Sequence, residues 1–386
     1  MKILVITPRF PWPLTKGDKL RAYHQMRCLS KHHEILLFAL SDELIPEEWV
    51  NELRPFCSVI RIHYLRKWKI ALRFIYGFFS RRPFQCIYHY ERKAAKELKK
   101  LVAKEKPDKL YFQLIRTAVY AEAYEPRKCI IDLMDCFSYH YLLRSWYSGI
   151  FLKYIYCIEF LRIKKYEGLI LNKYPFVTII SEKDRSLLPA NSNNVLIVPN
   201  GVVNEVNDEP VVIKFDLLFT GNLSYTPNIM AATFLCREII PLLRSKYSHL
   251  TAIIAGASPG RKILSLADNT ISVIPDVKDI EALRCRAKIF IAPMFLSTGM
   301  QNKILEAMAS GIPVLTTPDV AQAIGAISGK HLFTALNAND FAVQTEQLLN
   351  MTYNDRNVLI QQARSFVRSN FNWEKNTSLL DGIINK

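Results

Sequence analysis

Residues 293–314, PMFLSTGMQNKILEAMASGIPV, are the stretch that decides how this chain folds. A strand is predicted to end where the stretch begins, a polar turn containing Gly299 follows, and a helix is expected at residues 301–309. Free backbone amides at Met300 and Gln301 would then face the carboxyl edge of a parallel sheet, where helix N-termini bind anions. The stretch therefore predicts an anion site on an α/β domain.

Two charged residues follow in the predicted helix. Lys303 lies in the first turn, where its ammonium could add a point charge to a diphosphate, and Glu306 lies one turn further along the same face. A carboxylate at that position could accept hydrogen bonds from both hydroxyl groups of a ribose. The alternative is a buried helix in which Lys303 and Glu306 pair with each other, and the residues alone slightly favour this pairing.

Short apolar runs alternate with helical patterns along the rest of the chain. In the first half the predicted strands are residues 3–6, 34–39, 58–63, 109–112, 129–133 and 176–181. In the second half they are residues 215–220, 251–255, 271–274, 288–292, 314–317 and 331–335. Such alternation predicts parallel strands joined by crossover helices. We therefore expect an α/β protein with two Rossmann-like, doubly wound parallel-sheet domains facing a cleft.

The predicted domain boundary is an Asn-Gly turn at residues 200–201, followed by polar residues typical of a linker. A chain of 386 residues is also too long for one typical core. We expect one domain at residues 1–200 and a second domain at residues 201–362. A helical segment at residues 363–386 is expected to pack back on the N-terminal domain.

Charge is unevenly distributed along the chain. The net charge is +16, and residues 1–200 hold 34 Lys and Arg against 19 Asp and Glu, whereas the remainder is nearly neutral. This asymmetry indicates that the first domain meets an anionic partner: membrane lipid, a phosphorylated acceptor or nucleic acid. The aromatic and basic residues 64–82 suit a membrane surface, although a helix burying its aromatic face in the core fits equally well. The basic patch in this stretch is Arg66, Lys67, Lys69 and Arg73.

The eight cysteines are scattered and include no Cys-x-x-Cys pair, which is typical of a reduced, cytosolic chain. The apolar run at residues 3–6 is far shorter than that of a signal peptide. The most lipid-like segment, residues 146–161, is interrupted by Lys153 and Glu159 and is too short to span a bilayer. We expect no transmembrane helix and a cytoplasmic location.

Several motifs resemble those of one family. KILEAMASGIPV at residues 303–314 resembles the Lys-x-x-Glu-Ala-Met-Ala-x-Gly-x-Pro-Val segment of family-4 retaining glycosyltransferases, which have the two-domain GT-B fold. Further motifs resemble a subgroup found with exopolysaccharide systems, in the same order and spacing: TPRFPWP at 7–13, KGDKLR at 16–21, IDLMD at 131–135, ISE at 180–182, VPNGV at 198–202 and FTGNLSYTPNIMAA at 219–232. The resemblance extends over most of the chain.

The resemblance implies that the N-terminal domain at residues 1–200 binds the acceptor and that the C-terminal domain at residues 201–362 binds the nucleotide sugar, so the donor site is built mainly in the second domain. Glu306 would bind the nucleotide ribose, Val277 would lie near the base, and Gly17 would let the backbone approach the donor phosphates. The full set of implied donor-binding residues is Gly17, Gly221, Asn222, Val277, Gly299, Met300, Gln301, Lys303 and Glu306. The alternatives are an ordinary surface turn at Gly17 and a tight strand-to-helix turn at Gly221.

The predicted catalytic residues are Asp132, Asp135 and Lys303. Both aspartates end a predicted strand, where carboxylates are placed for an active site. The resemblance implies front-face transfer without an enzymatic nucleophile, in which Lys303 and the helix amides hold the leaving-group charge. Asp135 would contact the donor sugar or the acceptor, and a helix-capping role for it is nearly as well supported.

Two positions depart from the family pattern. Thr298 stands where many members have a glutamate that contacts the donor sugar, which leaves the identity of the sugar open. The loop after Gly221 lacks the Arg and Lys that neutralise the diphosphate in many members. Lys303 and the helix amides would then supply more of that stabilisation.

Together these observations predict a hexosyltransferase that moves a UDP- or GDP-linked sugar to a glycan or lipid-linked acceptor. The expected setting is exopolysaccharide, lipopolysaccharide or glycolipid synthesis, with peripheral contact to the inner face of a bacterial membrane. No cofactor is expected. No metal is expected either, because the resemblance implies that backbone amides and cations hold the diphosphate and the chain has no Asp-x-Asp motif. The alternatives are a nucleotide-sugar epimerase or hydrolase of the same fold, a basic nucleic-acid-binding protein without a recognisable motif, and an inactive scaffold.

Overall fold

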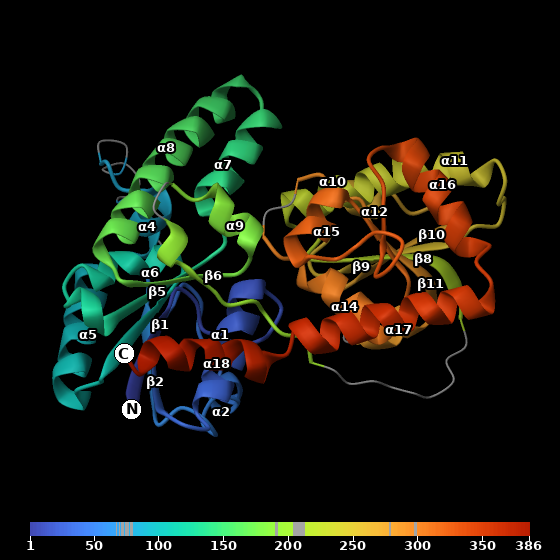
Figure 1. Cartoon of the computed structure of the whole chain (residues 1–386). Helices are drawn as coiled ribbons and strands as arrows, with labels where there is room; N and C mark the ends of the chain where they lie inside the picture. The colour runs from blue at the N-terminus through green and yellow to red at the C-terminus, as the bar shows by residue number, and fades with distance from the viewer. Residues whose placement is uncertain are drawn as a thin grey trace. The chain divides into compact units, whose positions relative to one another are not determined.

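The computed structural model describes residues 1–66, 68, 70, 73, 77, 80–189, 192–203, 213–277, 279–296 and 299–386. It divides into two compact units: unit 1 contains Met1–Asn200 and Trp373–Lys386, and unit 2 contains Gly201–Asn372. The chain therefore leaves unit 1, forms unit 2 and returns to unit 1 with its last helix (Figure 1). The segment expected at residues 363–386 contains parts of two helices, which are separated by residues 371–372. The first helix ends at Asn370 in unit 2, and the second begins at Trp373 in unit 1.

Unit 1 is built around a parallel sheet in which seven strands are found among its described residues, in the order β3-β2-β1-β4-β5-β6-β7. The strands are β1 (Lys2–Thr7), β2 (Glu34–Ser41), β3 (Val59–Tyr64), β4 (Lys109–Gln113), β5 (Cys129–Met134), β6 (Phe176–Ile179) and β7 (Leu196–Ile197). Alternate residues of β1 enter cores on opposite faces: Leu4 joins one cluster and Val5 the other. Both faces of the sheet are therefore buried, as in doubly wound folds.

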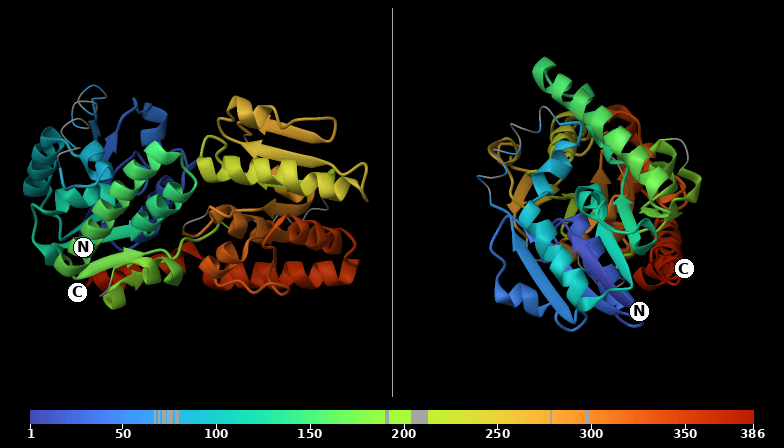
Figure 2. Two further views of the ribbon diagram at one scale, coloured as in Figure 1. Left: turned by 90° about the horizontal axis from the view of Figure 1, so that it is seen from above. Right: turned by 90° about the vertical axis from the view of Figure 1, so that its left-hand side faces the viewer.

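Helices cover both faces of this sheet (Figures 1 and 2). They are α1 (Gly17–Leu29), α2 (Glu47–Asn51), α4 (Phe84–His89), α5 (Arg92–Glu105), α6 (Leu114–Ala121), η1 (Pro126–Lys128), α7 (Phe137–Trp146), α8 (Ile150–Lys173), α9 (Glu182–Leu187), η2 (Ser192–Asn194) and α18 (Trp373–Ile384). The returning helix α18 packs on α1, where the rings of His24 and Trp373 stack 4.7 Å apart and Leu380 is fully buried. This packing ties the C-terminus into unit 1.

Unit 2 contains a second parallel sheet, with six strands among its described residues in the order β10-β9-β8-β11-β12-β13. The strands are β8 (Phe215–Thr220), β9 (Ala252–Gly256), β10 (Ile271–Pro275), β11 (Ala287–Ala292), β12 (Val314–Thr316) and β13 (Phe333–Thr334). The helices are α10 (Thr226–Phe234), the π-helical turn η3 (Leu235–Ile239), α11 (Ile240–Arg244), α12 (Arg261–Leu264), α13 (Ile280–Cys285), α14 (Asn302–Ser310), α15 (Pro318–Ile324), α16 (Ala338–Leu349) and α17 (Tyr353–Asn370). One continuous apolar core joins the sheet to these helices.

The two parallel sheets confirm the predicted α/β fold class with two Rossmann-like domains. Within the part of the chain that the structure describes, no helix combines the length and the apolar composition that crossing a bilayer requires.

Candidate functional site

The strand order of unit 2 reverses between β8 and β11, which are neighbours in the sheet. Doubly wound folds bind ligands beyond the carboxyl ends of the strands at such a point. The loop after β8 carries Gly221 and Asn222, and the loop after β11 leads into α14 through Gly299, Met300 and Gln301. The structure thus brings most of the predicted donor-binding residues to one edge of one sheet.

Lys303 lies in the first turn of α14, among neutral partners. Its Nζ donates a hydrogen bond to Oδ1 of Asn228 at 2.5 Å and lies 3.5 Å from Sδ of Met294 and 4.8 Å from the ring centre of Phe219. Burial lowers the pKa of Lys303 to about 7, although the charge of Glu306 acts in the opposite direction. An anionic ligand would supply the negative charge that this lysine lacks.

Asn228 is itself fixed by the loop after β8. Its Nδ2 donates to the carbonyl oxygen of Asn222 at 2.9 Å, and its side chain is buried at the start of α10. A Cβ added at Gly221 would lie 2.8 Å from this Nδ2, so glycine permits the close approach of loop and helix. The loop, Asn228 and Lys303 are therefore connected by hydrogen bonds. The sequence motif FTGNLSYTPN contains Asn228 but gives no sign of its contact with Lys303.

Glu306 is ion-paired with Arg284 and not with Lys303 of its own helix. Its Oε2 accepts a hydrogen bond from Nη2 of Arg284 at 2.5 Å, and Nη1 of Arg284 reaches Glu281 at the same distance. The alternative in which Lys303 and Glu306 pair is therefore wrong for this structure. Arg284 orients the carboxylate of Glu306, which remains partly exposed. Sequence reasoning missed Arg284, because its link to Glu306 joins two helices.

The segment before α14 turns sharply at Gly299, whose φ of +67° lies in the left-handed region that favours glycine. Gln301 is the N-cap residue of α14. Val277 follows β10 at the same carboxyl edge and is partly buried. Thr298, where the family pattern has a glutamate, lies outside the described residues.

In unit 1, Asp132 forms a buried bidentate ion pair with Arg21. Nε and Nη2 of Arg21 donate to the two carboxylate oxygens at 2.7 and 2.8 Å, and Thr178 Oγ1 adds a third hydrogen bond at 2.7 Å. Arg21 also donates to the backbone carbonyl of Val198 and to Oδ1 of Asn200. Asp132 is 0% exposed, so these contacts give it a structural role and leave no surface for a substrate. Asp132 is therefore not part of the proposed site.

Asp135 lies just beyond β5, in a group of buried carboxylates. Burial and the nearby charge of Asp184 raise the pKa of Asp135 to about 7. Burial likewise raises the pKa of Glu167 to about 7, and its Oε2 has no hydrogen-bond partner among the described residues. A carboxyl group with a pKa near neutrality can exchange a proton with a substrate hydroxyl. Asp135 is partly exposed, whereas Asp184 and Glu167 are buried.

The backbone beside Asp135 departs from a regular strand. Met134 has a φ of +65°, and the pairing of β5 with β6 shifts register between Asp132 and Met134. A Cβ added at Gly17 would lie 3.3 Å from Cε of Met134. The predicted glycine at the start of α1 therefore lies against the turn that carries Asp135, and bulges of this kind commonly aim a side chain at a site.

Arg116 and Arg9 are cations of this region that sequence reasoning missed. Among the described residues, Arg116 makes one hydrogen bond, from Nε to Oε1 of Gln85 at 3.0 Å, and its Nη1 lies 3.9 Å from Oδ2 of Asp18. Arg9 donates to the same Asp18 oxygen at 2.9 Å. Burial and the charge of Arg9 lower the pKa of Arg116. Two arginines that share one carboxylate leave positive charge available to an anionic ligand.

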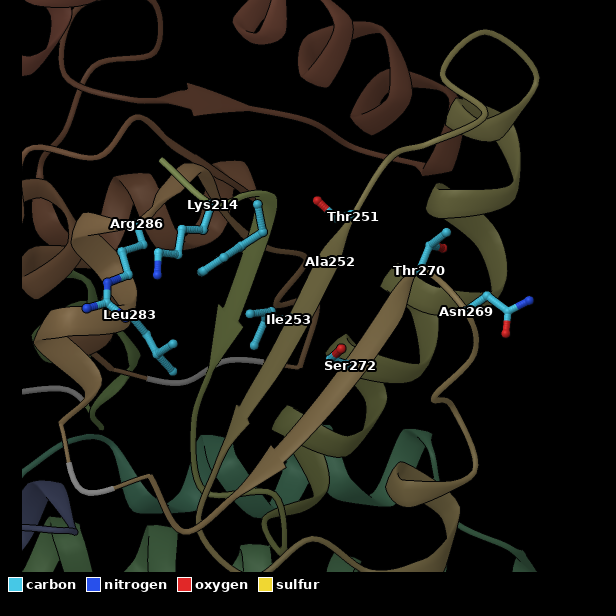
Figure 3. Close-up of a pocket in the computed structure, with 10 residues that line it drawn as sticks. Lys214, Thr251, Ala252, Ile253, Asn269, Thr270, Ser272, Leu283 and Arg286 are labelled. Carbon is cyan, nitrogen blue, oxygen red and sulfur yellow. The ribbon is translucent and has the colours of Figure 1, made fainter. Parts of the chain in front are cut away.

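A pocket of unit 2 lies at the opposite edge of its sheet (Figure 3). It is lined by residues at the starts of β8, β9 and β10 and by the end of α13, including Lys214, Thr251, Thr270, Ser272 and Arg286. This edge contains the amino ends of the strands, where doubly wound folds do not place their active sites. The pocket is therefore separate from the site around Lys303.

Comparisons with known proteins concern the fold and the second unit. Residues 214–351 match the family model described as Glycosyl transferases group 1. Among solved structures, the Anabaena protein HepE in complex with UDP has a TM-score of 0.72 at 13% identity, and the match covers 100% of both chains. Sucrose-phosphate synthase from Thermosynechococcus elongatus has a TM-score of 0.71 at 13% identity, covering 100% of this chain and 98% of that chain.

Residues 214–351 therefore match a glycosyltransferase family model, and the whole chain shares the GT-B fold of these two solved structures. A sequence relative of similar length comes from Klebsiella pneumoniae and is described as an uncharacterized 44.6 kDa protein in the cps region. It is 22% identical over 394 residues, and the match covers 97% of each chain. The GT-B fold implied by the sequence motifs is confirmed.

Proposed function

We propose that this protein is a retaining, family-4 type glycosyltransferase that moves a sugar from a nucleotide-diphosphate sugar to a glycan or lipid-linked acceptor. The proposed setting is the synthesis of a cell-surface polysaccharide or glycolipid on the cytoplasmic side of a membrane. The relative in a Klebsiella cps region supports this setting, and HepE, solved in complex with UDP-glucose, supports a UDP-linked donor.

The observation that carries the proposal is the poorly compensated charge of Lys303. A lysine held among an amide oxygen, a thioether and an aromatic ring is costly as an ammonium ion, which is why burial lowers its pKa to about 7. A diphosphate placed at the N-terminus of α14 would remove that cost, because the helix amides and the ammonium would both face its oxygens. The same charges would stabilise the nucleoside diphosphate as it leaves.

Glu306 would bind the ribose of the donor. Arg284 holds Oε2 and so fixes the orientation of the carboxylate, while the lone pairs that this bond leaves free can accept ribose hydroxyls. The second partner of Arg284, Glu281, lies on α13 and makes an equally short contact. Glu281 therefore offers a matched control, because its removal also disturbs Arg284 but leaves the proposed ribose acceptor in place.

In unit 1, Asp135 is proposed to contact the donor sugar or the acceptor hydroxyl. Its pKa of about 7 suits proton exchange near neutral pH, and Gly17 packs against the turn that presents it. Arg116 and Arg9 would hold an anionic group of the substrate nearby. Retention would then follow front-face attack, with the donor phosphate or Asp135 receiving the acceptor proton.

A thermal-shift screen against UDP, GDP, CMP and their sugars tests the donor site, because a ligand that binds only the native state raises its melting temperature. We expect stabilisation by one nucleotide family, strong reduction of that shift in Glu306→Ala, and a shift close to wild type in Glu281→Ala. Equal loss in both variants would assign the effect to Arg284 and contradict the ribose role. NMR of a transfer product would then establish whether the anomeric configuration is retained.

A further inference from the structure

The hairpin of α7 and α8 exposes an unusual number of large apolar side chains. The two helices lie side by side in unit 1, and their connection lies at the end away from the sheet (Figure 1). We define the hairpin surface by six exposed side chains near this connection: Trp146, Tyr147, Ile150, Phe151, Tyr154 and Ile158. Ile150 is 81% exposed, Phe151 79% and Tyr154 69%, so these residues contribute nothing to the core. Ile150, Tyr154 and Ile158 are spaced four residues apart and so lie along one face of α8, and an exposed apolar face of this kind marks an interaction site.

The exposed charge of the hairpin has one sign. Residues 137–173 contain two acidic residues, Glu159 and Glu167, and both are buried. Glu159 accepts a hydrogen bond from the backbone of Gln85, and Glu167 accepts one from the backbone of Ser138. The exposed charges of the hairpin are four lysines: Lys153 lies within the hairpin surface, Lys164 and Lys165 lie further along α8, and Lys173 is the last residue of α8. The hairpin therefore presents apolar and aromatic groups together with uncompensated positive charge.

We infer that the hairpin surface docks on an anionic lipid membrane. Trp and Tyr side chains favour the interfacial region of a bilayer, because each combines an apolar ring with a polar group. A lysine near the bilayer surface, such as Lys153 within the hairpin surface, is attracted to a negatively charged leaflet. The residues suit a helix pair lying in the interface plane, since the chain has no described helix able to cross a bilayer.

A second copy of the chain fits this surface less well. An isologous contact would place the lysine-bearing surfaces of two protomers against each other, and an excess of like charge across an interface is destabilising. A lipid surface instead offers negative charge to every exposed lysine at once. Charge complementarity thus selects the membrane over self-association.

The basic patch predicted from the sequence is a weaker candidate for the same role. Arg73 is already ion-paired with Glu91 at 3.5 Å, and it also donates to the backbone carbonyl of Tyr90. Lys67 and Lys69 lie outside the described residues, and Arg66 is exposed. The hairpin surface, whose acidic residues are both buried, is therefore the region that we assign to lipid.

Cosedimentation of the whole protein with vesicles tests this inference. We compare phosphatidylcholine vesicles with vesicles that also contain phosphatidylglycerol, and we compare wild type with the triple variant Ile150→Ser/Phe151→Ser/Tyr154→Ser. Wild type is expected to bind the anionic vesicles, less so at high salt, and the variant to bind at least about tenfold more weakly, because three apolar side chains lose their burial. A matched control, Val343→Ser/Tyr353→Ser/Val358→Ser, removes three exposed apolar side chains of unit 2 and should bind like wild type.

A second pair of variants tests how much the lysines of the hairpin contribute to vesicle binding. Lys153→Gln/Lys164→Gln/Lys165→Gln should weaken binding to anionic vesicles, whereas Lys96→Gln/Lys99→Gln/Lys100→Gln removes the same charge from exposed positions of α5 and should not. Wild-type binding by the hairpin triple variant, or no binding by wild type, would overturn the inference. Self-association that the hairpin substitutions abolish, without vesicle binding, would assign the surface to a second copy instead.

This inference stands independently of the proposed function. The thermal shift produced by a nucleotide donor should be the same in the hairpin variants as in wild type, because the substituted residues lie in unit 1 and the donor residues around Lys303 in unit 2. If neither wild type nor any hairpin variant binds a nucleotide donor, the proposed function is contradicted, but the vesicle experiment still tests the membrane inference.

Discussion

Arg21 in unit 1 and Lys303 in unit 2 are both cations held against a parallel sheet, but their surroundings differ sharply. Arg21 has a bidentate carboxylate partner in Asp132 and two further acceptors, and it is 0% exposed. Lys303 has an amide oxygen and a sulfur atom as its partners. Burial alone would lower the pKa of Arg21, yet the ion pair with Asp132 raises it, whereas burial lowers the pKa of Lys303 to about 7.

The difference separates structural charge from charge kept for a ligand. A buried ion whose every donor is satisfied inside the protein has nothing to gain from a substrate. A partly buried ion with neutral partners, such as Lys303, loses hydration without gaining a counter-charge, and a ligand of opposite charge can offset that loss. By this criterion we assign Lys303 to the proposed binding site and Arg21 to the scaffold, although both come from sequence motifs of the same family resemblance.

The largest expected effect comes from breaking the Arg21 pair. Arg21→Met should lower the free energy of unfolding by about 3–5 kcal/mol, because it leaves the carboxylate of Asp132 buried without a counter-charge. Urea denaturation measures the loss. The double variant Arg21→Met/Asp132→Leu should recover part of it, since neither charge then remains. A loss below about 1 kcal/mol in the single variant would show that the pair has no structural role.

Lys303→Met should show the reverse pattern. Stability in the absence of ligand should be equal to or above that of wild type, because the costly ammonium is replaced by an apolar chain of similar length. Transfer of sugar from a nucleotide donor should fall by about 10²–10³-fold, as expected when one group that stabilises developing charge is lost. Parallel urea and activity measurements test both halves. A large loss of stability would move Lys303 into the same class as Arg21.

The positions of the strands could be predicted from sequence because each is a compact apolar run. Predicted strands at residues 34–39 and 215–220 correspond to β2 (Glu34–Ser41) and β8 (Phe215–Thr220), for example. The helix pair α7 and α8 could not be predicted this way. Much of α8 exposes its apolar residues, so the periodicity that marks an amphipathic helix is weak in residues 146–161.

The sequence predicts those features of the candidate site that depend on residues close together in the chain. The motif around Lys303 and the glycines that precede two helices were visible, because helix starts and tight turns have local signals. The partners were not. Asn228 lies 75 positions from Lys303, and Arg21 lies 111 positions from Asp132. Only the folded chain distinguishes the aspartate that is buried in an ion pair from the neighbouring Asp135, which stays partly exposed.

The smallest expected effect is the uptake of a proton when the donor binds. With a pKa of about 7, Lys303 is mostly neutral at pH 8 without ligand, and a diphosphate should raise its pKa and make it bind a proton. Binding of UDP-glucose at pH 8 should therefore take up close to one proton, and affinity should fall as pH rises above 7, at most about tenfold per pH unit. Titration calorimetry in two buffers of different ionisation enthalpy measures the uptake.

The control for this measurement is Lys288→Met, which removes a lysine ion-paired to Asp216 at 2.7 Å on the same sheet. Proton uptake should persist in that variant and disappear in Lys303→Met. UDP-glucose is the better probe than UDP, because its diphosphate lacks the terminal phosphate that titrates near neutral pH. Proton uptake that persists in Lys303→Met would assign the proton to another group. The difference in partners between Arg21 and Lys303 would then give no support to a donor-binding role for Lys303.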